Sequence, residues 1–176
     1  GWGMVILLMV TGCSTTRDGF AYRAYHNMHA KYNGLFYATE AMEEAEQVLY
    51  EGYEENWDEI LPIFPPVDET TAQQVYPLME RAIEKSTKVV DKHTMSSSRR
   101  EQKDLKRPEL NKWIDDNYDV IARAHLIKGE KEKALEVFQY LVRTLDYPDA
   151  QAWSNAWMAR TYMAFDDRVR ASNTLI

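Results

Sequence analysis

Apolar residues recur every three or four positions along most of the chain, and no segment alternates apolar and polar residues over the length of a strand. This spacing places apolar side chains on one face of a helix, so it predicts helices throughout. A first helix is expected from about 19 to 32 and a second from about 39 to 53. The dipeptide Asn33-Gly34 between them is typical of turns, which predicts that the two helices form a hairpin.

The middle of the chain predicts one further helix after an irregular segment. Residues 57–66 (WDEILPIFPP) are apolar and end in two prolines, so they cannot continue a regular helix. The next helix is expected to begin at Asp68 or Thr70 and to reach about His93. Pro77 lies inside this pattern, which predicts either a kink or a later start.

A helical pattern repeats towards the end of the sequence. Ala122 and Ala134 recur as Ala159 and Ala171, which is 37 residues later in each case (122 to 159 and 134 to 171). The other positions of the pattern are His125, Gly129, Phe138 and Pro148 in the first copy, and Tyr162, Asp166 and Leu175 in the second. The pattern is similar to tetratricopeptide repeats, which are helical hairpins of about 34 residues with small residues where the two helices cross.

Helical hairpins of this kind cannot bury their apolar sides alone, so they stack. The predicted fold is therefore all-α, an α-solenoid of tetratricopeptide-like helical hairpins. The second copy stops at Ile176 inside its second helix, from which we expect the chain to be the N-terminal piece of a longer solenoid. An unusual final helix is the alternative.

The first residues predict a lipid anchor. Residues 4–10 are apolar and uncharged, which is too short for a membrane span but fits the apolar region of a secretory signal. Val10, Thr11, Gly12 and Cys13 follow, a sequence that resembles the lipobox of bacterial lipoproteins. No basic residue precedes the apolar run, so we expect the true N-terminus to lie upstream. A buried N-terminal segment with a structural cysteine is the alternative interpretation.

Lipidation would fix the location of the protein. Cys13 is the one cysteine, so no internal disulfide is possible, and a covalent lipid on it would leave no free thiol. The next residue, Ser14, is not the aspartate that favours retention in the inner membrane, so we expect an outer-membrane anchor that faces the periplasm. The expected organisation is a signal-peptide remnant (1–12), a lipidated tether (13–18), divergent helical hairpins (19–95), a basic polar connector (96–108) and tetratricopeptide-like repeats (109–176).

Charge and motif content indicate a non-enzymatic protein. The formal net charge of −7 and the pI near 5.2 argue against a dedicated nucleic-acid binder. Acidic residues gather in 40–59 and basic residues in 99–107, as a solvated helix face and loop or, alternatively, as patches that steer docking. No phosphate-binding glycine loop, Gly-x-Ser-x-Gly or His-Glu-x-x-His sequence occurs. We expect no catalytic site and no cofactor besides the lipid.

The histidines do not predict a metal site. His26 and His29 are three residues apart and can share a helix face, but two histidines without a nearby acidic ligand are expected to be a solvated or interface pair. His93 falls at a helix end, where a cation complements the helix dipole.

The aromatic residues are better candidates for function, because aromatic side chains and arginine dominate binding hot spots. Most of the 21 Phe, Trp and Tyr residues are expected in the core (5 Phe, 5 Trp and 11 Tyr). A minority could form a partner-binding surface, for which the candidates are Tyr25, His26, Trp57, Phe64, Trp153 and Trp157.

Several segments together resemble one family. After the lipobox come Tyr25-His26-Asn27 and Ala30-Lys31-Tyr32-Asn33, then the run from Trp57 to Pro65, then Ala82 to Ser86 with Lys92 to Met95, and finally Lys112 to Tyr118. With them, the chain is similar to the N-terminal region of the SprE/PorW lipoproteins of Bacteroidota, which are tetratricopeptide lipoproteins of the type IX secretion system and are coupled to gliding motility.

The resemblance implies a non-enzymatic scaffold held by lipid in the outer membrane. Its partners would be the periplasmic ring lipoprotein, the ring and motor proteins, and the outer-membrane translocon, with no nucleic acid and no small-molecule substrate. The alternatives are another tetratricopeptide scaffold lipoprotein of envelope assembly, or a helical envelope lipoprotein that binds a ligand or glycan.

Overall fold

The computed structural model describes residues 19–58, 61–66, 69–96, 109–145 and 148–175. Over these ranges the chain is helical, and the β-type pairing found is one isolated antiparallel bridge between Ser96 and Glu109. The all-α prediction is therefore confirmed. The elements are α2 (Phe20–His29), η1 (Ala30–Leu35), α3 (Phe36–Glu51), α4 (Glu69–His93), α6 (Ile114–Ile127), α7 (Lys131–Thr144), α8 (Pro148–Ala164) and α9 (Arg168–Thr174).

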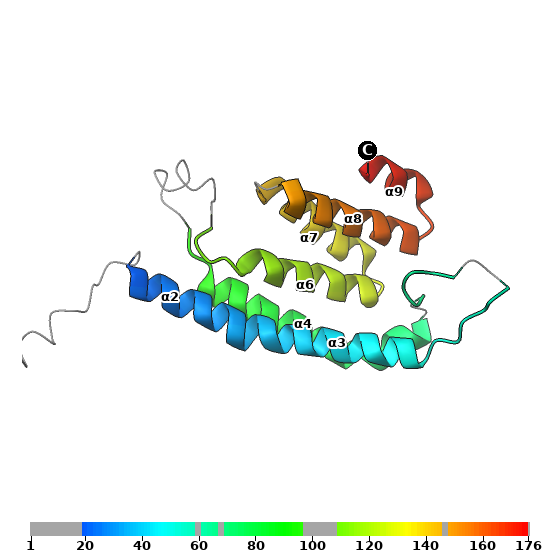
Figure 1. Cartoon of the computed structure of the whole chain (residues 1–176), viewed down its shortest axis with the longest axis horizontal. Helices are drawn as coiled ribbons and strands as arrows, with labels where there is room; N and C mark the ends of the chain where they lie inside the picture. Colours follow the sequence, from blue (N-terminus) through cyan, green and yellow to red (C-terminus); the bar gives the residue numbers. More distant parts are fainter. Residues whose placement is uncertain (1–18, 59–60, 67–68, 97–108, 146–147, 176) are drawn as a thin grey trace, which may run out of the picture.

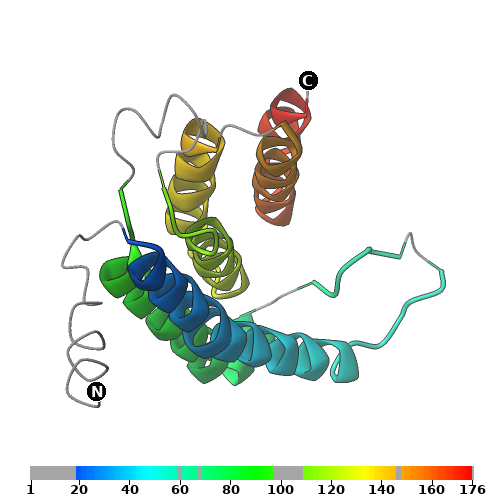
Figure 2. The same cartoon turned by 60° about the vertical axis from the view of Figure 1, so that its left-hand side comes forward.

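The helices form a stack in which each one packs against the next along the chain (Figure 1). The first hairpin pairs the long α2–η1–α3 helix with α4, the second pairs α6 with α7, and the third pairs α8 with α9. Figure 2 shows the three hairpins one after another, with α9 at the end of the stack that is far from α2 and α3. This arrangement is the stacked, repeat-like helical fold that the sequence pattern predicts.

The expected turn at Asn33-Gly34 is wrong. Residues 30–35 form the π-helical turn η1, and the chain continues as a helix from α2 into α3. Gly34 is buried at this point, and a Cβ atom built on it would lie 1.7 Å from Cγ2 of Val89 on α4. The glycine therefore serves a close approach between two helices. Region 19–95 contains one long hairpin over its described residues instead of several.

Helix α4 begins at Glu69, between the two predicted starting positions, and continues through Pro77, so of the two alternatives raised by that proline the later start is wrong. Pro77 is exposed. Proline lacks the N–H that would bond the carbonyl of Gln73 one turn earlier, and that carbonyl is left to other partners. The other face of α4 is held by the core, in which Val75 and Met79 are fully buried. Packing of the amphipathic face thus outweighs the local cost of the proline.

The core within the first hairpin, which α6 also joins, is built from small residues and flexible large ones. Along α3, Ala38, Ala41 and Ala45 are 0 % exposed, and they meet Met79 and Ala82 of α4. Small side chains let two helices approach closely, while methionine fills the irregular space beside them.

The repeat positions pack as their spacing predicts. Phe138 is fully buried in one cluster with Ala122 and Ala134, and Ala159 and Ala171 are buried in the next. Leu175 differs, because it is 65 % exposed.

The two repeat turns share one backbone conformation. Gly129 has φ +77° between α6 and α7, and Asp166 has φ +55° between α8 and α9. Asp166 thus occupies the place of the turn glycine in the second copy, and aspartate is among the few residues that tolerate this left-handed region. His125, at the aromatic position of the first copy, is part-buried and pairs with Glu130 instead of entering the core.

The junction between α4 and α6 is anchored and partly buried. The Glu109 carboxylate accepts hydrogen bonds from the backbone N–H groups of Met95 and Asn111, both at 2.7 Å. Met95 is buried, and Ser96, the first residue of the predicted connector, is exposed. Residues 97–108 of that connector lie outside the described residues.

Candidate interaction surface

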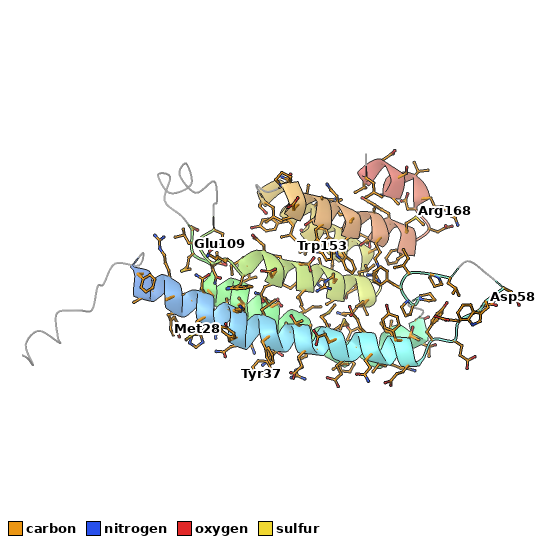
Figure 3. The ribbon with its side chains drawn as sticks, viewed as in Figure 1. Met28, Tyr37, Asp58, Glu109, Trp153 and Arg168 are labelled. Carbon is orange, nitrogen blue, oxygen red and sulfur yellow. The ribbon has the colours of Figure 1, made fainter. Side chains whose placement is uncertain are left out.

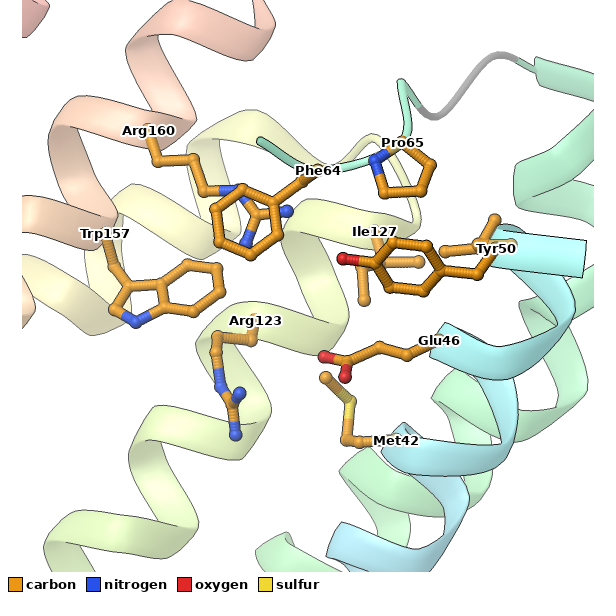
Figure 4. A pocket seen from close by; sticks show the side chains of 10 residues that line it. Met42, Glu46, Tyr50, Phe64, Pro65, Arg123, Ile127, Trp157 and Arg160 are labelled. Atoms are coloured by element: carbon orange, nitrogen blue, oxygen red, sulfur yellow. The ribbon is translucent and has the colours of Figure 1, made fainter. Parts of the chain in front are cut away.

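The first helix of each hairpin faces a shared hollow, which we call the inner cleft. Its lining comes from α3, α6 and α8. Two residues of segment 61–66, which we call the proline segment, lie over it (Figure 4). The lining residues are Met42, Glu46, Leu49, Tyr50, Phe64, Pro65, Arg123, Ile127, Trp157 and Arg160. With Phe64 in place the volume is about 50 Å³, far below the several hundred Å³ of a usual small-molecule site.

Three side chains stack in the middle of the inner cleft. The guanidinium of Arg160 lies 3.4 Å from the ring centroid of Phe64 and 4.4 Å from that of Trp157. The Phe64 and Trp157 rings are 6.1 Å apart. A planar cation between two aromatic faces gains cation–π attraction and packing together. This stack attaches the proline segment to α8.

A second group continues the surface along α6 and α8. The indole N–H of Trp153 donates to Asp119 at 3.2 Å, and Arg123 pairs with the same carboxylate at 2.9 Å. The Trp153 and Trp157 rings lie 6.0 Å apart, and Trp153 is 54 % exposed. Figure 3 shows the position of Trp153 on α8. Burial raises the pKa of Asp119, against the opposing effects of Arg123 and Trp153.

Arg160 has no carboxylate within 4.0 Å among the described residues. Burial lowers the pKa of its guanidinium to about 10, and the positive charge of Arg123 acts in the same direction. Glu46 and Tyr50 oppose this shift without pairing with it. The inner cleft therefore contains a part-buried cation that is satisfied by aromatic faces and not by a counter-ion.

The sequence-predicted aromatic candidates fall into three places. Phe64 and Trp157 come together in the inner cleft, and Trp153 lies beside it in contact with Trp157. Trp57 is 78 % exposed and shares no ring contact with them. Tyr25 and His26 lie on α2, in a different group at the other end of the first hairpin.

This other group is a cluster of histidines, which we call the histidine cluster. Nδ1 of His26 lies 2.9 Å from Nδ1 of His93, and the rings of His29 and His93 are stacked 5.8 Å apart. Tyr25 packs edge-on against His26 with ring centroids 5.3 Å apart. The amide of Asn111 donates to the backbone carbonyl of His93 at 2.9 Å, which joins this cluster to the α4–α6 junction.

Protonation of the histidine cluster is opposed by its surroundings. Burial and then the neighbouring His29 lower the pKa of His26. Burial and then His26 and His29, with Lys92, lower the pKa of His93. A hydrogen bond between the two Nδ1 atoms also requires one of them to lack a proton. Among the described residues no group of three or more His, Cys, Asp and Glu side chains is arranged to hold a metal ion.

Sequence reasoning missed three residues of these sites. His93 was assigned to a helix end, and its contact with His26 depends on how α4 pairs with α2, which a local pattern does not show. Arg160 lies three residues after Trp157, a spacing that places the two side chains on one helix face and could have marked the pair. No comparable spacing in the sequence marked Arg123 as part of the inner cleft.

The predicted lipid anchor is not covered by the structure. Val10, Thr11, Gly12 and Cys13 lie outside the described residues. Of the helices that are described, none combines the length and the apolar character that a membrane crossing requires. A scan of protein-family models and a search of curated proteins find no match to this chain.

Proposed function

We propose that this chain is part of a non-enzymatic scaffold that binds other proteins, and that it serves the type IX secretion system as an outer-membrane lipoprotein. The observation that carries the binding role is the inner cleft, where three hairpins contribute one face with Phe64 and Trp157 on it and Trp153 beside it. The assignment to type IX secretion is supported by the resemblance of the sequence segments to SprE/PorW lipoproteins. Gliding motility would be affected through the same machine.

The fold suits a scaffold for physical reasons. Stacked hairpins bury a continuous core and hold the helices in fixed relative positions, so a partner meets a preformed surface and pays little ordering entropy. Large aromatic side chains beside arginine are the residues that dominate binding energy at protein interfaces. We assign the pairs α6–α7 and α8–α9 to tetratricopeptide-type repeats, supported by the buried alanines and the two positive-φ turns.

The anchor would be the lipid on Cys13. One acyl chain binds a membrane only marginally, whereas two or more give stable attachment, so a triacylated cysteine would suffice. The short tether would then keep the helical stack close to the periplasmic side of the outer membrane. In this position the scaffold would connect the periplasmic ring and motor proteins to the outer-membrane translocon.

Affinity purification tests this proposal. The tagged protein is isolated from detergent-solubilised outer membranes, in its natural form and as Cys13→Ala, and the accompanying proteins are identified. We expect ring and translocon components with the natural form and their loss with Cys13→Ala. Recovery of a different envelope machine would favour another scaffold role. A protein that is anchored through Cys13 but purifies alone would contradict the scaffold role and favour ligand binding.

A further inference from the structure

The segment Leu61–Pro66 occupies the inner cleft in an unusual way. Phe64 and Pro65 contribute to the lining, and the Phe64 ring stacks on Arg160. No hydrogen bond joins residues 61–66 to any other described residue. The segment is therefore held in the cleft by ring and apolar contacts alone, and Ile63 beside Phe64 is 87 % exposed.

Residues 61–66 do not fill the inner cleft completely and do not provide a partner for its charged group. Phe64 remains 42 % exposed in its place. Arg160 is part-buried against two aromatic rings without an ion-pair partner among the described residues, while Arg123 beside it is paired with Asp119. An arginine in an apolar, part-buried place gains most from a carboxylate, which it can bind through two parallel hydrogen bonds. The segment 61–66 has no carboxylate to offer.

We propose that residues 61–66 are an internal occupant of the inner cleft, and that an extended peptide of a partner protein replaces them there. The partner peptide presents an aromatic side chain for the place of Phe64 and a nearby carboxylate for Arg160. This inference specifies how the proposed scaffold binds its partner. It rests on the proposed function, because that proposal identifies the partner as a protein. It also explains the small volume of the cleft, since the space that a ligand would fill is taken by Phe64.

The tether and the added ion pair act in opposite directions. Because the internal segment belongs to the same chain, it competes with a free peptide at a high effective concentration and opposes its binding. An added carboxylate–arginine pair gives the partner an advantage that the internal segment lacks. Removing Phe64 should therefore strengthen binding of a free peptide, and removing the charge of Arg160 should abolish the preference for a carboxylate.

The test uses a fluorescein-labelled hexapeptide with the sequence of residues 61–66 in which aspartate replaces the final proline, and a matched probe with asparagine there. Binding to the full purified chain is measured by fluorescence anisotropy. Phe64→Ala should bind the aspartate probe roughly tenfold more tightly than the natural chain does. It should prefer aspartate over asparagine severalfold, and adding Arg160→Gln should remove that preference.

Two controls separate these effects from general damage. Ile63→Ala changes an exposed neighbour in the same segment, and Arg168→Gln changes an arginine whose side chain is 80 % exposed on α9, so both should bind like the natural chain. A third comparison uses Phe64→Ala with Arg160 left as it is. In this variant, added salt should weaken binding of the aspartate probe more than binding of the asparagine probe.

Equal affinity of the natural chain and Phe64→Ala would overturn the occupancy by residues 61–66. Equal affinity of the two probes for Phe64→Ala, or no binding of either, would overturn the proposed peptide site. These results need no secretion component, so they are independent of the affinity purification that tests the scaffold role.

Discussion

Gly34→Ala adds one methyl group at a close approach between the long first helix and α4. The new Cβ would lie 1.7 Å from Cγ2 and 3.2 Å from Cβ of Val89, which is itself 3 % exposed. Carbon atoms pack at about 3.5–4.0 Å, so roughly 2 Å of separation must be created. Val89 cannot readily turn away, because a valine in a helix has one strongly preferred rotamer.

The magnitude follows from two opposing effects. Forcing an extra carbon into a packed core costs about 1–3 kcal/mol. Replacing glycine by alanine within a helix returns up to about 1 kcal/mol. The 1.7 Å separation places the cost at the upper end of its range, so we expect Gly34→Ala to lower the free energy of unfolding by about 2 kcal/mol. Gly52→Ala is the matched control, because its Cβ would meet no atom closer than 3.4 Å and its φ of −84° suits alanine.

Urea unfolding followed by far-ultraviolet circular dichroism measures both variants. Gly34→Ala should shift the midpoint downward and Gly52→Ala should leave it unchanged or raise it. Val89→Ala removes the 1.7 Å contact and leaves the 3.2 Å contact to Cβ, so in that background adding Gly34→Ala should cost much less, and the double-mutant cycle should show strong coupling. A Gly34→Ala protein as stable as Gly52→Ala would refute the close-approach explanation of this glycine.

Three further predictions concern the core, a turn and the histidines. Phe138→Ala empties a fully buried site, so urea unfolding should show a loss of about 3–5 kcal/mol. Asp166→Gly relieves a positive φ, and the same assay should show a gain of up to about 1 kcal/mol. Folding lowers the pKa of His26 and His93 from 6.5, so at lower pH the unfolded chain binds more protons than the folded chain does. The free energy of unfolding should therefore keep its full value above pH 6.5 and decrease towards pH 5, and this decrease should be smaller in His93→Gln.

Much of the fold was accessible from the sequence because the second half is locally consistent. From Ile114 onward, apolar spacing, small residues at the crossings and turn residues all predict the same hairpins, and the structure contains them. Even the substitution of Asp166 for a turn glycine keeps the conformation that the repeat requires.

The first hairpin was mispredicted for an identifiable reason. Asn33-Gly34 has the composition of a turn, but the cause of the glycine is Val89, which lies 55 residues later (34 to 89) and is not visible in any local window. The same limit applies to the sites. Trp153 and Trp157 could be grouped from their helical spacing, whereas the meeting of Phe64 with Arg160 and of His26 with His93 depends on how the hairpins stack.

Site-specific photo-crosslinking in the cells that produce the protein tests the central claim most directly. A photoreactive amino acid replaces Trp153, whose ring contacts Trp157 at the edge of the inner cleft, or, as a control, Tyr140, which is 40 % exposed on α7 and contacts no residue of the cleft lining through its ring. The account predicts a crosslink to a ring or translocon protein of the secretion machine from position 153 and none from position 140. No crosslink from position 153, or the same product from both positions, would contradict it.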